Sequence, residues 1–417
     1  MDNIRINTER LWASLMEMAE IGATAAGGSC RLALTEEDRA GRDLFKRWCE
    51  DAGCTVAVDQ VGNMYATRDG TAGAGNDAAR LPVATGSHLD TQPKGGRFDG
   101  VFGVLAGLEV MRTLNDHGIR TQAPIEVINW TNEEGSRFAP AMLASGVFAG
   151  LFDKQYAFDR TDENGVRFDE ALRQIGYAGD LEPGERKYKA LFEAHIEQGP
   201  ILERHDHTIG VVTGGQGQRW YDVTITGRDS HTGTTPMDAR RDALAAAAVL
   251  IQAVEQIAFD HTPGVATVGA LTVSPNSRNT IPGQVELTID IRHPDDAALS
   301  LMADAVAQAR EAIMAARSVE IALDEIWYSP PTPFDPDCIG AVRNATEVLG
   351  YPHQDMVSGA GHDAIQVASV APTAMIFVPC ADGLSHNEAE SATPADLAAG
   401  CNVLLHAMLE RAGVVAD

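Results

Sequence analysis

Short apolar runs that stop at polar residues, with helical stretches between them, constrain the fold of this chain more than any other feature. Leu81–Thr85 is followed by His88, and Ile125–Trp130 is followed by two adjacent glutamates. Between these runs, Asp99–Gly118 carries apolar residues at helical spacing and closes on a glycine. Strands that alternate with helices favour a largely parallel sheet, so we expect an α/β fold.

Residues with metal-ligand chemistry follow several of these apolar runs. One further run stops near His195, and Met375–Val378 leads to His386. In an open parallel sheet, the ligand crevice lies beyond the carboxyl ends of the strands. The sequence therefore predicts one site at this edge, assembled from four separate strands.

The middle of the chain has a different order of elements. We expect strands at 219–226, 264–273, 284–293 and 318–328, and helices at 236–258 and 296–316. This βαββαβ order is that of a ferredoxin-like sandwich. We place it at 212–328, inserted as a lid into a mostly parallel-sheet, metal-binding catalytic domain formed by 1–211 and 329–417. An alanine-rich helix and an otherwise uncovered sheet favour a role of the lid in dimerisation, and a lid in a monomer is the alternative.

The charge balance restricts the possible partners. The chain has 32 Lys and Arg against 59 Asp and Glu, a formal net charge of −27. Nucleic acids and anionic membrane surfaces require basic patches, so neither is an expected partner. An acidic small-molecule substrate would need a local cation in its binding site.

Sequence signals of location favour a cytoplasmic protein. The N-terminal segment lacks the pattern of a signal peptide, and no stretch approaches 18 consecutive apolar residues. The six cysteines are scattered and form no C-x-x-C pair, which favours reduced thiols. We therefore expect neither export nor a membrane span.

Five candidate metal ligands follow the predicted strands. They are His88, Asp99, Glu134, His195 and His386. Three imidazoles and two carboxylates suit zinc, manganese, cobalt or nickel better than calcium or magnesium. Five ligands suit two ions when one carboxylate bridges a pair about 3.5–4 Å apart. The simpler alternative is a turn rich in Gly and Asp next to ordinary surface histidines.

Asp99 is the natural bridge between the two ions, because it lies in a tight loop between the two groups of ligands. We expect His88, Asp99 and His195 on one ion. Asp99, Glu134 and His386 would then hold the other ion, with Asp99 as the bridge. Their common placement at strand ends favours this two-metal site over the alternative.

Two further acids have distinct predicted roles. Asp90 lies two residues after His88 on the same side of an extended chain, where it can accept the other ring N–H and orient this ligand. Glu133 precedes Glu134 and would face the gap between the ions as general base and then general acid. The alternative is a pair of acids that opens a helix, where the macrodipole favours negative charge.

A series of motifs runs through the chain from about residue 80 to 400: GSHLDT…GGRFDG, TNEEGSRF, HIEQGP, SHTGTTPM, PNSRNTIPG…DIRH, SGAGHDA and GLSHNEAE. In these motifs and in their order, the chain resembles the hydantoinase/carbamoylase branch of the dinuclear-metal peptidase–amidohydrolase superfamily. HIEQGP is particularly specific, because related peptidases and acylases usually have an acidic residue where His195 falls. The resemblance implies the two-metal assignment, a catalytic domain with a dimerising lid, and a homodimer.

The resemblance also implies substrate contacts. They would come from Gln198, His231, Asn279 and Arg292. Arg292 ends a lid strand, where a fixed guanidinium can grip a carboxylate through two hydrogen bonds. His231, as a catalytic residue, and Asn279 can donate hydrogen bonds to a developing oxyanion, from the same chain or from a partner subunit. Gln198 can both donate to and accept from a ureido group.

The motif SGAGHDA contributes backbone and supporting groups. Gly359 and Gly361 would let the backbone approach a substrate carboxylate closely, and both are expected to bind substrate. His362 and Asp363 are expected to buttress the site from behind.

The reaction implied is hydrolysis of the ureido C–N bond of an N-carbamoyl amino acid, which releases the amino acid, ammonia and carbon dioxide. Two metals would activate a shared water and polarise the carbamoyl carbonyl. DTQPKGGRFDG and GQGQRWYD look closer to β-ureidopropionases and N-carbamoyl-L-amino acid hydrolases than to allantoate amidohydrolases. Allantoate hydrolysis is the alternative. A catalytically silent protein that binds ureido ligands is a third possibility, which Glu133 argues against because binding alone does not need this acid.

Overall fold

The computed structural model describes residues 4–72 and 80–415, and the chain divides into two compact units. The first unit comprises Met1–Gly214 and Pro333–Asp417, and the second comprises Gly215–Thr332. The insert thus begins and ends a few residues later than the predicted 212 and 328. We call the first the catalytic unit and the second the lid unit.

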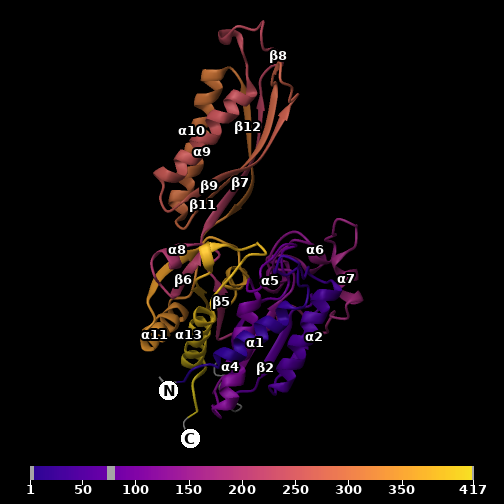
Figure 1. Ribbon diagram of the computed structural model, residues 1–417, viewed down its shortest axis with the longest axis vertical. Coiled ribbons are helices and arrows are strands. Elements are labelled where there is room, and N and C mark those ends of the chain that lie inside the picture. The colour runs from indigo at the N-terminus through magenta and orange to yellow at the C-terminus, as the bar shows by residue number, and fades with distance from the viewer. Residues whose placement is uncertain (1–3, 73–79, 416–417) are drawn as a thin grey trace. The chain divides into compact units, whose positions relative to one another are not determined.

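The catalytic unit is built on a sheet with a parallel centre (Figure 1). The central strands lie in the order β4 (Ile125–Trp130), β3 (Val83–His88), β5 (Ala190–Ile196) and β15 (Thr373–Val378), and all four are parallel. Next to β4 lie β2 (Met64–Arg68) and then β1 (Thr55–Val58), both antiparallel to their neighbours. Next to β15 lies antiparallel β6 (Ile209–Gly215), which borders β13 (Thr332–Pro333) and β14 (His353–Ser358). The predicted mostly parallel α/β fold is confirmed.

Helices cover both faces of this sheet. The helices α4 (Val101–Asp116), α11 (Pro336–Leu349) and α13 (Pro394–Ala412) pack on one face, while α12 (Asp363–Val367) lies on the other. The helix α5 (Leu143–Phe148) contacts α12 and contributes side chains to both cores. Within residues 4–72, 80–214 and 333–415, the remaining helices of this unit are α1 (Thr8–Ala19), α2 (Glu36–Asp51), α6 (Lys154–Phe158), α7 (Phe168–Gln174), α8 (Ile201–Arg204) and the short 3₁₀ helix Ala381–Gly383.

The central strands are rich in apolar residues because both of their faces are buried. In β5, Phe192 belongs to the core under α4 and α13, whereas its neighbour Leu191 belongs to the core on the opposite face. Ile376 and Met375 of β15 divide in the same way. Successive side chains of a strand point to opposite faces, so each apolar run supplies two cores at once.

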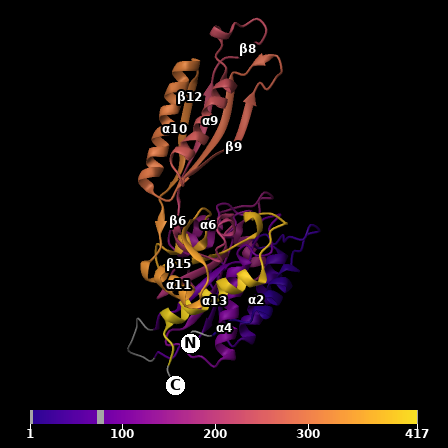
Figure 2. The same cartoon turned by 60° about the vertical axis from the view of Figure 1, so that its left-hand side comes forward.

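The lid unit has the predicted βαββαβ order. Its strands are β7 (Gly217–Thr226), β9 (Val265–Ser274), β11 (Gln284–His293) and β12 (Glu320–Ser329), arranged as β12-β7-β11-β9 and antiparallel throughout. The helices α9 (Ala243–Asp260) and α10 (Asp296–Arg317) cover one face of the sheet (Figure 2). A separate two-stranded ribbon is formed by β8 (Ser230–His231) with β10 (Thr280–Ile281) and extends beyond one end of the sheet (Figure 1).

The first lid helix begins later than its sequence predicts. Residues from 236 were expected to be helical, but Met237–Ala239 form a 3₁₀ turn and α9 starts at Ala243. The Asp242 side chain accepts a hydrogen bond from the Ala245 amide and thereby caps the helix. A capping aspartate satisfies an amide that has no partner within the helix, which fixes the start there rather than at Pro236.

Among the described helices, α9 is long and apolar enough to cross a membrane, judged by length and composition alone. The sequence did not single it out, because polar residues interrupt its apolar stretch. Its residues Ala246, Leu250, Val254 and Ile257 lie in the lid core. Packing against the lid sheet accounts for the apolar residues on this side of the helix.

Candidate metal centre and active site

The five predicted ligands meet at the carboxyl edge of the parallel strands. His88 is the last residue of β3, and His195 lies one residue before the end of β5. Glu134 and His386 occupy the loops that follow β4 and β15, and Asp99 lies two residues before α4. Neighbouring parallel strands end at the same edge of a sheet, which is why residues so far apart in sequence converge.

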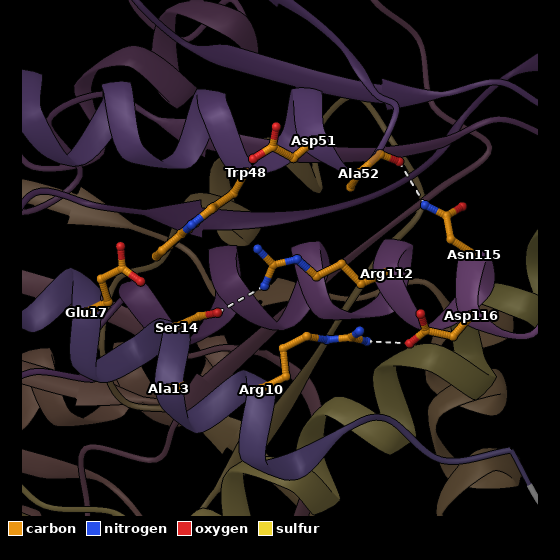
Figure 3. A pocket seen from close by; sticks show the side chains of 10 residues that line it. All are labelled: Arg10, Ala13, Ser14, Glu17, Trp48, Asp51, Ala52, Arg112, Asn115 and Asp116. Atoms are coloured by element: carbon orange, nitrogen blue, oxygen red, sulfur yellow. Dashed lines mark hydrogen bonds and ion pairs between the residues drawn. The ribbon is translucent and has the colours of Figure 1, made fainter.

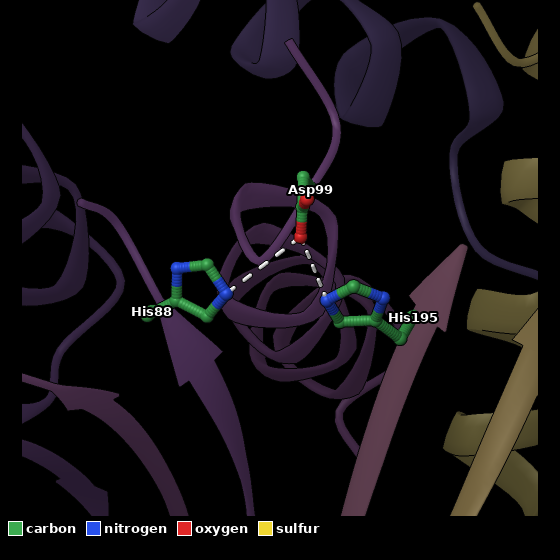
Figure 4. Close-up of side chains that lie close together, drawn as sticks. All are labelled: His88, Asp99 and His195. Carbon is green, nitrogen blue, oxygen red and sulfur yellow. Dashed lines mark ion pairs between the residues drawn. The ribbon is translucent and has the colours of Figure 1, made fainter. Parts of the chain in front are cut away.

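Asp99 stands between two groups of ligands. Its Oδ1 lies 3.8 Å from His88 Nε2 and 3.2 Å from His195 Nε2 (Figure 4). Its Oδ2 lies 3.3 Å from His386 Nε2, which is in turn 3.4 Å from Glu134 Oε2. In each group, the candidate ligand atoms lie within 4.8 Å of one another. One carboxylate that offers one oxygen to each group is the geometry that a bridged pair of cations requires.

The histidine tautomers fit metal binding. His88 Nδ1 lies 2.8 Å from the Asp90 carbonyl oxygen, and His195 Nδ1 lies 2.9 Å from the Ile196 carbonyl oxygen. A carbonyl only accepts hydrogen bonds, so Nδ1 carries a proton, and Nε2 is the ring atom that faces Asp99 and can bind a metal. The donor set therefore suits borderline divalent cations.

Asp90 orients His88 by a different atom from the one predicted. The main-chain carbonyl of Asp90 contacts the ring, while its carboxylate accepts hydrogen bonds from the amides of Glu133 and Glu134, both at 3.3 Å. Because the Asp90 carboxylate binds the loop of the two glutamates, the Asp90 carbonyl is the group that contacts the His88 ring. Asp90 thus supports one histidine ligand and the loop of both glutamates.

Glu133 lies beside the ligands, with Oε2 3.4 Å from His88 Nε2. Burial, and then the negative charges of neighbours that include Asp363 and Glu134, raise the pKa of Glu133 well above its usual value. Two bound cations would act in the opposite direction and lower this pKa. A buried carboxyl group whose pKa is raised by burial and lowered by bound cations can take up a proton and release it again.

Three residues that the sequence did not single out hold the ligands in place. Ser385 Oγ lies 2.9 Å from Asp99 Oδ2, and Gln92 donates to Glu134 Oε2 at 2.7 Å. Glu390 Oε1 accepts hydrogen bonds from the amides of Phe98, at 2.9 Å, and Asp99, at 3.2 Å. Their only sequence signal is that they lie in the same motifs as the ligands.

The motif SGAGHDA lies between β14 and α12. His362 is buried, and its ring packs edge-on against His195 with centroids 4.6 Å apart, as expected for a supporting residue. Asp363 is buried at the start of α12. Gly359 and Gly361 are exposed in the loop before them.

Within the part of the chain that the structure describes, the side-chain amide of Gln198 forms hydrogen bonds through its nitrogen but not through its oxygen. Its Nε2 donates to Asp99 Oδ2 at 3.0 Å and to Ser385 Oγ at 3.2 Å. Its Oε1 is buried and has no hydrogen-bond partner among the described residues. A buried acceptor without a partner is costly, so Gln198 is suited to accept a hydrogen bond from a ureido N–H.

The lid brings His231 and Asn279 together. His231 pairs with Thr280 across the β8–β10 ribbon, next to Asn279. His231 Nδ1 accepts hydrogen bonds from the amides of Gly233, at 3.1 Å, and Thr234, at 3.2 Å. The ring proton of neutral His231 therefore lies on Nε2, which makes this exposed side chain a hydrogen-bond donor.

Arg292 lies at the other end of the lid sheet. It pairs with Gln218 near the start of β7, whereas β8 follows the end of β7 at Thr226 (Figure 1). The rise along a strand is about 3.4 Å per residue, so positions 218 and 226 are about 27 Å apart. Within one chain, Arg292 and the pair His231–Asn279 are too far apart to contact one small molecule.

A hollow of about 480 Å³ on the catalytic unit is not part of this site (Figure 3). It lies between α1, α2 and the carboxyl end of α4, where Arg112 hydrogen-bonds Ser14. Asp99 precedes the opposite end of α4, which has 16 residues and a length of about 24 Å. The hollow and the ligands are thus separated by the length of a helix.

Two ligand groups that share one carboxylate, with a buried proton-carrying acid beside them, are typical of hydrolases that use a pair of divalent cations. Comparisons with known proteins agree with this class. The profile of peptidase family M20/M25/M40 matches residues 84–410. An N-carbamoyl-L-amino-acid amidohydrolase of Rhizobium meliloti is 52% identical over 415 residues, which cover 99% of each chain.

The solved structures give the finer placement. A hydantoinase/carbamoylase family amidase from Burkholderia multivorans is 59% identical, with a TM-score of 0.94 over 98% of each chain. The chain belongs to peptidase family M20/M25/M40 and, within it, to the hydantoinase/carbamoylase amidases, as the motifs predicted. It is therefore a hydrolase of amide or ureido C–N bonds.

The relatives also rank the functions considered above. An N-carbamoyl-L-amino acid amidohydrolase of Geobacillus stearothermophilus is 40% identical over 98% of this chain and 99% of its own. An allantoate amidohydrolase of Escherichia coli (strain K12) is 35% identical over 93% of this chain and 94% of its own. Allantoate amidohydrolases are thus more distant relatives, which disfavours the alternative reaction.

Proposed function

We propose that this protein hydrolyses the ureido C–N bond of N-carbamoyl-L-amino acids, and that N-carbamoyl-β-amino acids are the nearest variant of its substrate. The observation that carries the proposal is the arrangement of two ligand groups on the two oxygens of Asp99, with Glu133 beside them. The identity of 52% to an N-carbamoyl-L-amino-acid amidohydrolase supports this substrate class. The products would be an amino acid, ammonia and carbon dioxide.

Two divalent cations per subunit, zinc or else manganese, cobalt or nickel, would be held by the donors described above. His88, Asp99 and His195 would bind one cation, and Asp99, Glu134 and His386 the other. Bound there, the pair would supply an activated water and polarise the carbamoyl carbonyl. Imidazole and carboxylate donors fit these metals better than calcium or magnesium.

The protein's own groups would carry out the remaining tasks. Glu133 would take a proton at its carboxylate and deliver it to the leaving nitrogen. Gln198 Oε1 would accept a hydrogen bond from the ureido N–H, and His231 Nε2–H would donate one to the developing oxyanion, with Asn279 as a second donor. Arg292 would hold the substrate carboxylate, while the backbone of Gly359 and Gly361 borders it.

We propose further that the enzyme is a homodimer and that each site takes His231 and Asn279 from the partner subunit. The separation of about 27 Å along the lid sheet supports this, because it exceeds the length of an N-carbamoyl amino acid about threefold. A second copy of the lid can supply the missing donors to a site that uses Arg292 of its own chain. The six free thiols agree with a reducing cytoplasm, which we propose as its location.

The test is ammonia release by metal-depleted protein reconstituted with Zn, Mn, Co or Ni. The panel contains several N-carbamoyl-L-amino acids, their D-enantiomers, N-carbamoyl-β-alanine and allantoate. We expect turnover of the L-series or the β-substrate in at least one metal form. Preference for allantoate in every metal form would overturn the proposal.

Two adjacent variants provide a matched pair for Glu133. Glu133→Gln should keep two metals per subunit and lose nearly all turnover. Glu134→Gln should lose metal, because this residue belongs to the second ligand group. Wild-type-like turnover by Glu133→Gln would contradict its role as proton carrier.

A further inference from the structure

We propose that Asp290 is a positioning residue that fixes the guanidinium of Arg292 and thereby sets the preference of the enzyme for substrates with a carboxylate. The inference rests on the proposed function, since it concerns how Arg292 would recognise the N-carbamoyl amino acid. No role follows for Asp290 from its sequence alone, because an acid two residues before an arginine on a strand is common.

The contact between the two side chains is specific. Arg292 Nε donates to both carboxylate oxygens of Asp290, at 3.0 and 3.1 Å, and Arg292 Nη2 donates to Oδ2 at 2.6 Å. The aspartate thus grips the side-on edge of the guanidinium. A substrate carboxylate would meet the end-on edge, formed by Nη1 and Nη2. The planar guanidinium is rigid, so holding one edge sets the direction of the other.

The pair lies on the open face of the lid sheet. Ile289 and Ile291, its neighbours on β11, point into the core beneath α9 and α10. Alternation along a strand therefore places Asp290 and Arg292 on the face without helices. The side chains remain 31% and 28% exposed. A partly exposed ion pair contributes little to folding, while the buried isoleucines hold the strand, so loss of Asp290 should leave the lid folded.

Two effects of Asp290 oppose each other, and their magnitudes decide the sign. As a negative charge, it repels a substrate carboxylate, and removal of one such charge across a solvated site would tighten binding about threefold. As a clamp, it keeps a long side chain ordered before the substrate arrives, and loss of that order would weaken binding about tenfold. The clamp dominates, so Asp290→Asn should weaken binding about threefold overall.

The experiment compares N-carbamoyl amino acids with the corresponding amides, which carry a neutral group in place of the carboxylate. In Asp290→Asn, KM for the acid should rise about threefold with kcat nearly unchanged, while the kinetics of the amide stay the same. Asp290→Glu retains the charge and the acceptor oxygens, and should restore most of the loss. In an Arg292→Ala background, Asp290→Asn should have no further effect.

Asp222→Asn is the matched control. Asp222 is exposed on the same face, on β7, where it pairs with Thr288 rather than with Arg292. Its loss removes the same charge without removing the clamp, so KM for the acid should stay constant or fall. Thermal unfolding and metal content should match those of the wild type in both variants.

Binding of the acid to the Glu133→Gln protein, measured by calorimetry with and without Asp290→Asn, gives a readout without turnover. Unchanged or tighter binding upon Asp290→Asn would overturn the inference. If the wild-type enzyme hydrolyses no N-carbamoyl amino acid, the proposed function fails instead. The two failures are therefore distinguishable.

Discussion

Two inactive variants of this enzyme should restore activity to each other when they share a dimer. Glu133→Gln removes the proposed proton carrier, and His231→Ala removes a proposed hydrogen-bond donor, a loss that costs about 10²–10³ in kcat at comparable oxyanion sites. If His231 serves the partner's site, a mixed dimer contains one site with Glu133 from one chain and His231 from the other. The second site of the same dimer carries both defects.

The expected magnitude follows from the geometry and from random pairing. Arg292 pairs with Gln218, and the end of β7 that leads to His231 is about 27 Å away along one lid, so one substrate cannot use both residues of a single chain. Random association of equal amounts of the two chains makes half of the dimers mixed, and each mixed dimer has one intact site of two. The mixture should therefore show about a quarter of wild-type activity, and purified mixed dimers about half.

The assay is ammonia release by dimers carrying two different affinity tags, purified over both tags in turn. A mixture of Glu133→Gln with His386→Ala is the control, because both residues lie in the catalytic unit and each site of a mixed dimer then carries one defect. This control should show no recovery. Mixed Glu133→Gln/His231→Ala dimers that are no more active than their parents would refute the reasoning and assign His231 to its own chain's site.

Three further outcomes are expected. His386→Ala should lose about one metal equivalent per subunit by elemental analysis, and an unchanged metal content would contradict its assignment to the second ligand group. Gly100→Ala should disrupt the first ligand group, because Gly100 has φ +66° and an added Cβ would lie 2.3 Å from His88 Nε2. Gly118→Ala is the control: Gly118 has φ +62° at the other end of α4, and its added Cβ would meet no atom within 4 Å. This variant should keep metal and activity. The hydrogen bond to Asp99 raises the pKa of His386 to about 9, and burial raises the pKa of Glu134 to about 8, so protons compete with the second cation below these values. The affinity of the protein for the second cation, measured with a competing chelator, should therefore rise with pH up to about 9. An affinity that does not depend on pH would refute the displacement of this cation by protons.

Much of the site could be predicted from local sequence patterns. His88 and the loop of Glu133 and Glu134 were placed correctly at one edge because apolar runs mark buried parallel strands and parallel strands end together. Both predicted groups around Asp99 are brought together in the structure, which also places Glu193, His195 and His362 close to one another. The resemblance of the motifs supplied the family, which the comparisons confirm.

Other features depend on atoms that no local pattern specifies. The sequence allows α9 to begin at Pro236, but the cap formed by Asp242 makes the helix begin at Ala243. The carbonyl of Asp90, rather than its carboxylate, reaches His88 because the carboxylate binds two amides of another loop. Ser385 and Glu390 have no metal-ligand role of their own, so only their contacts reveal that they support Asp99.

The sequence by itself determined the order of elements and the residue types at the strand ends, because hydrophobic periodicity and chain order are local properties. The tertiary structure alone decided which of these residues can act on the same molecule. The distance between Arg292 and His231 depends on the register of β11 and β7, strands that are separated along the chain by α9, β9 and the β8–β10 ribbon. A shift of that register would change which residues face each other without any change in the motifs.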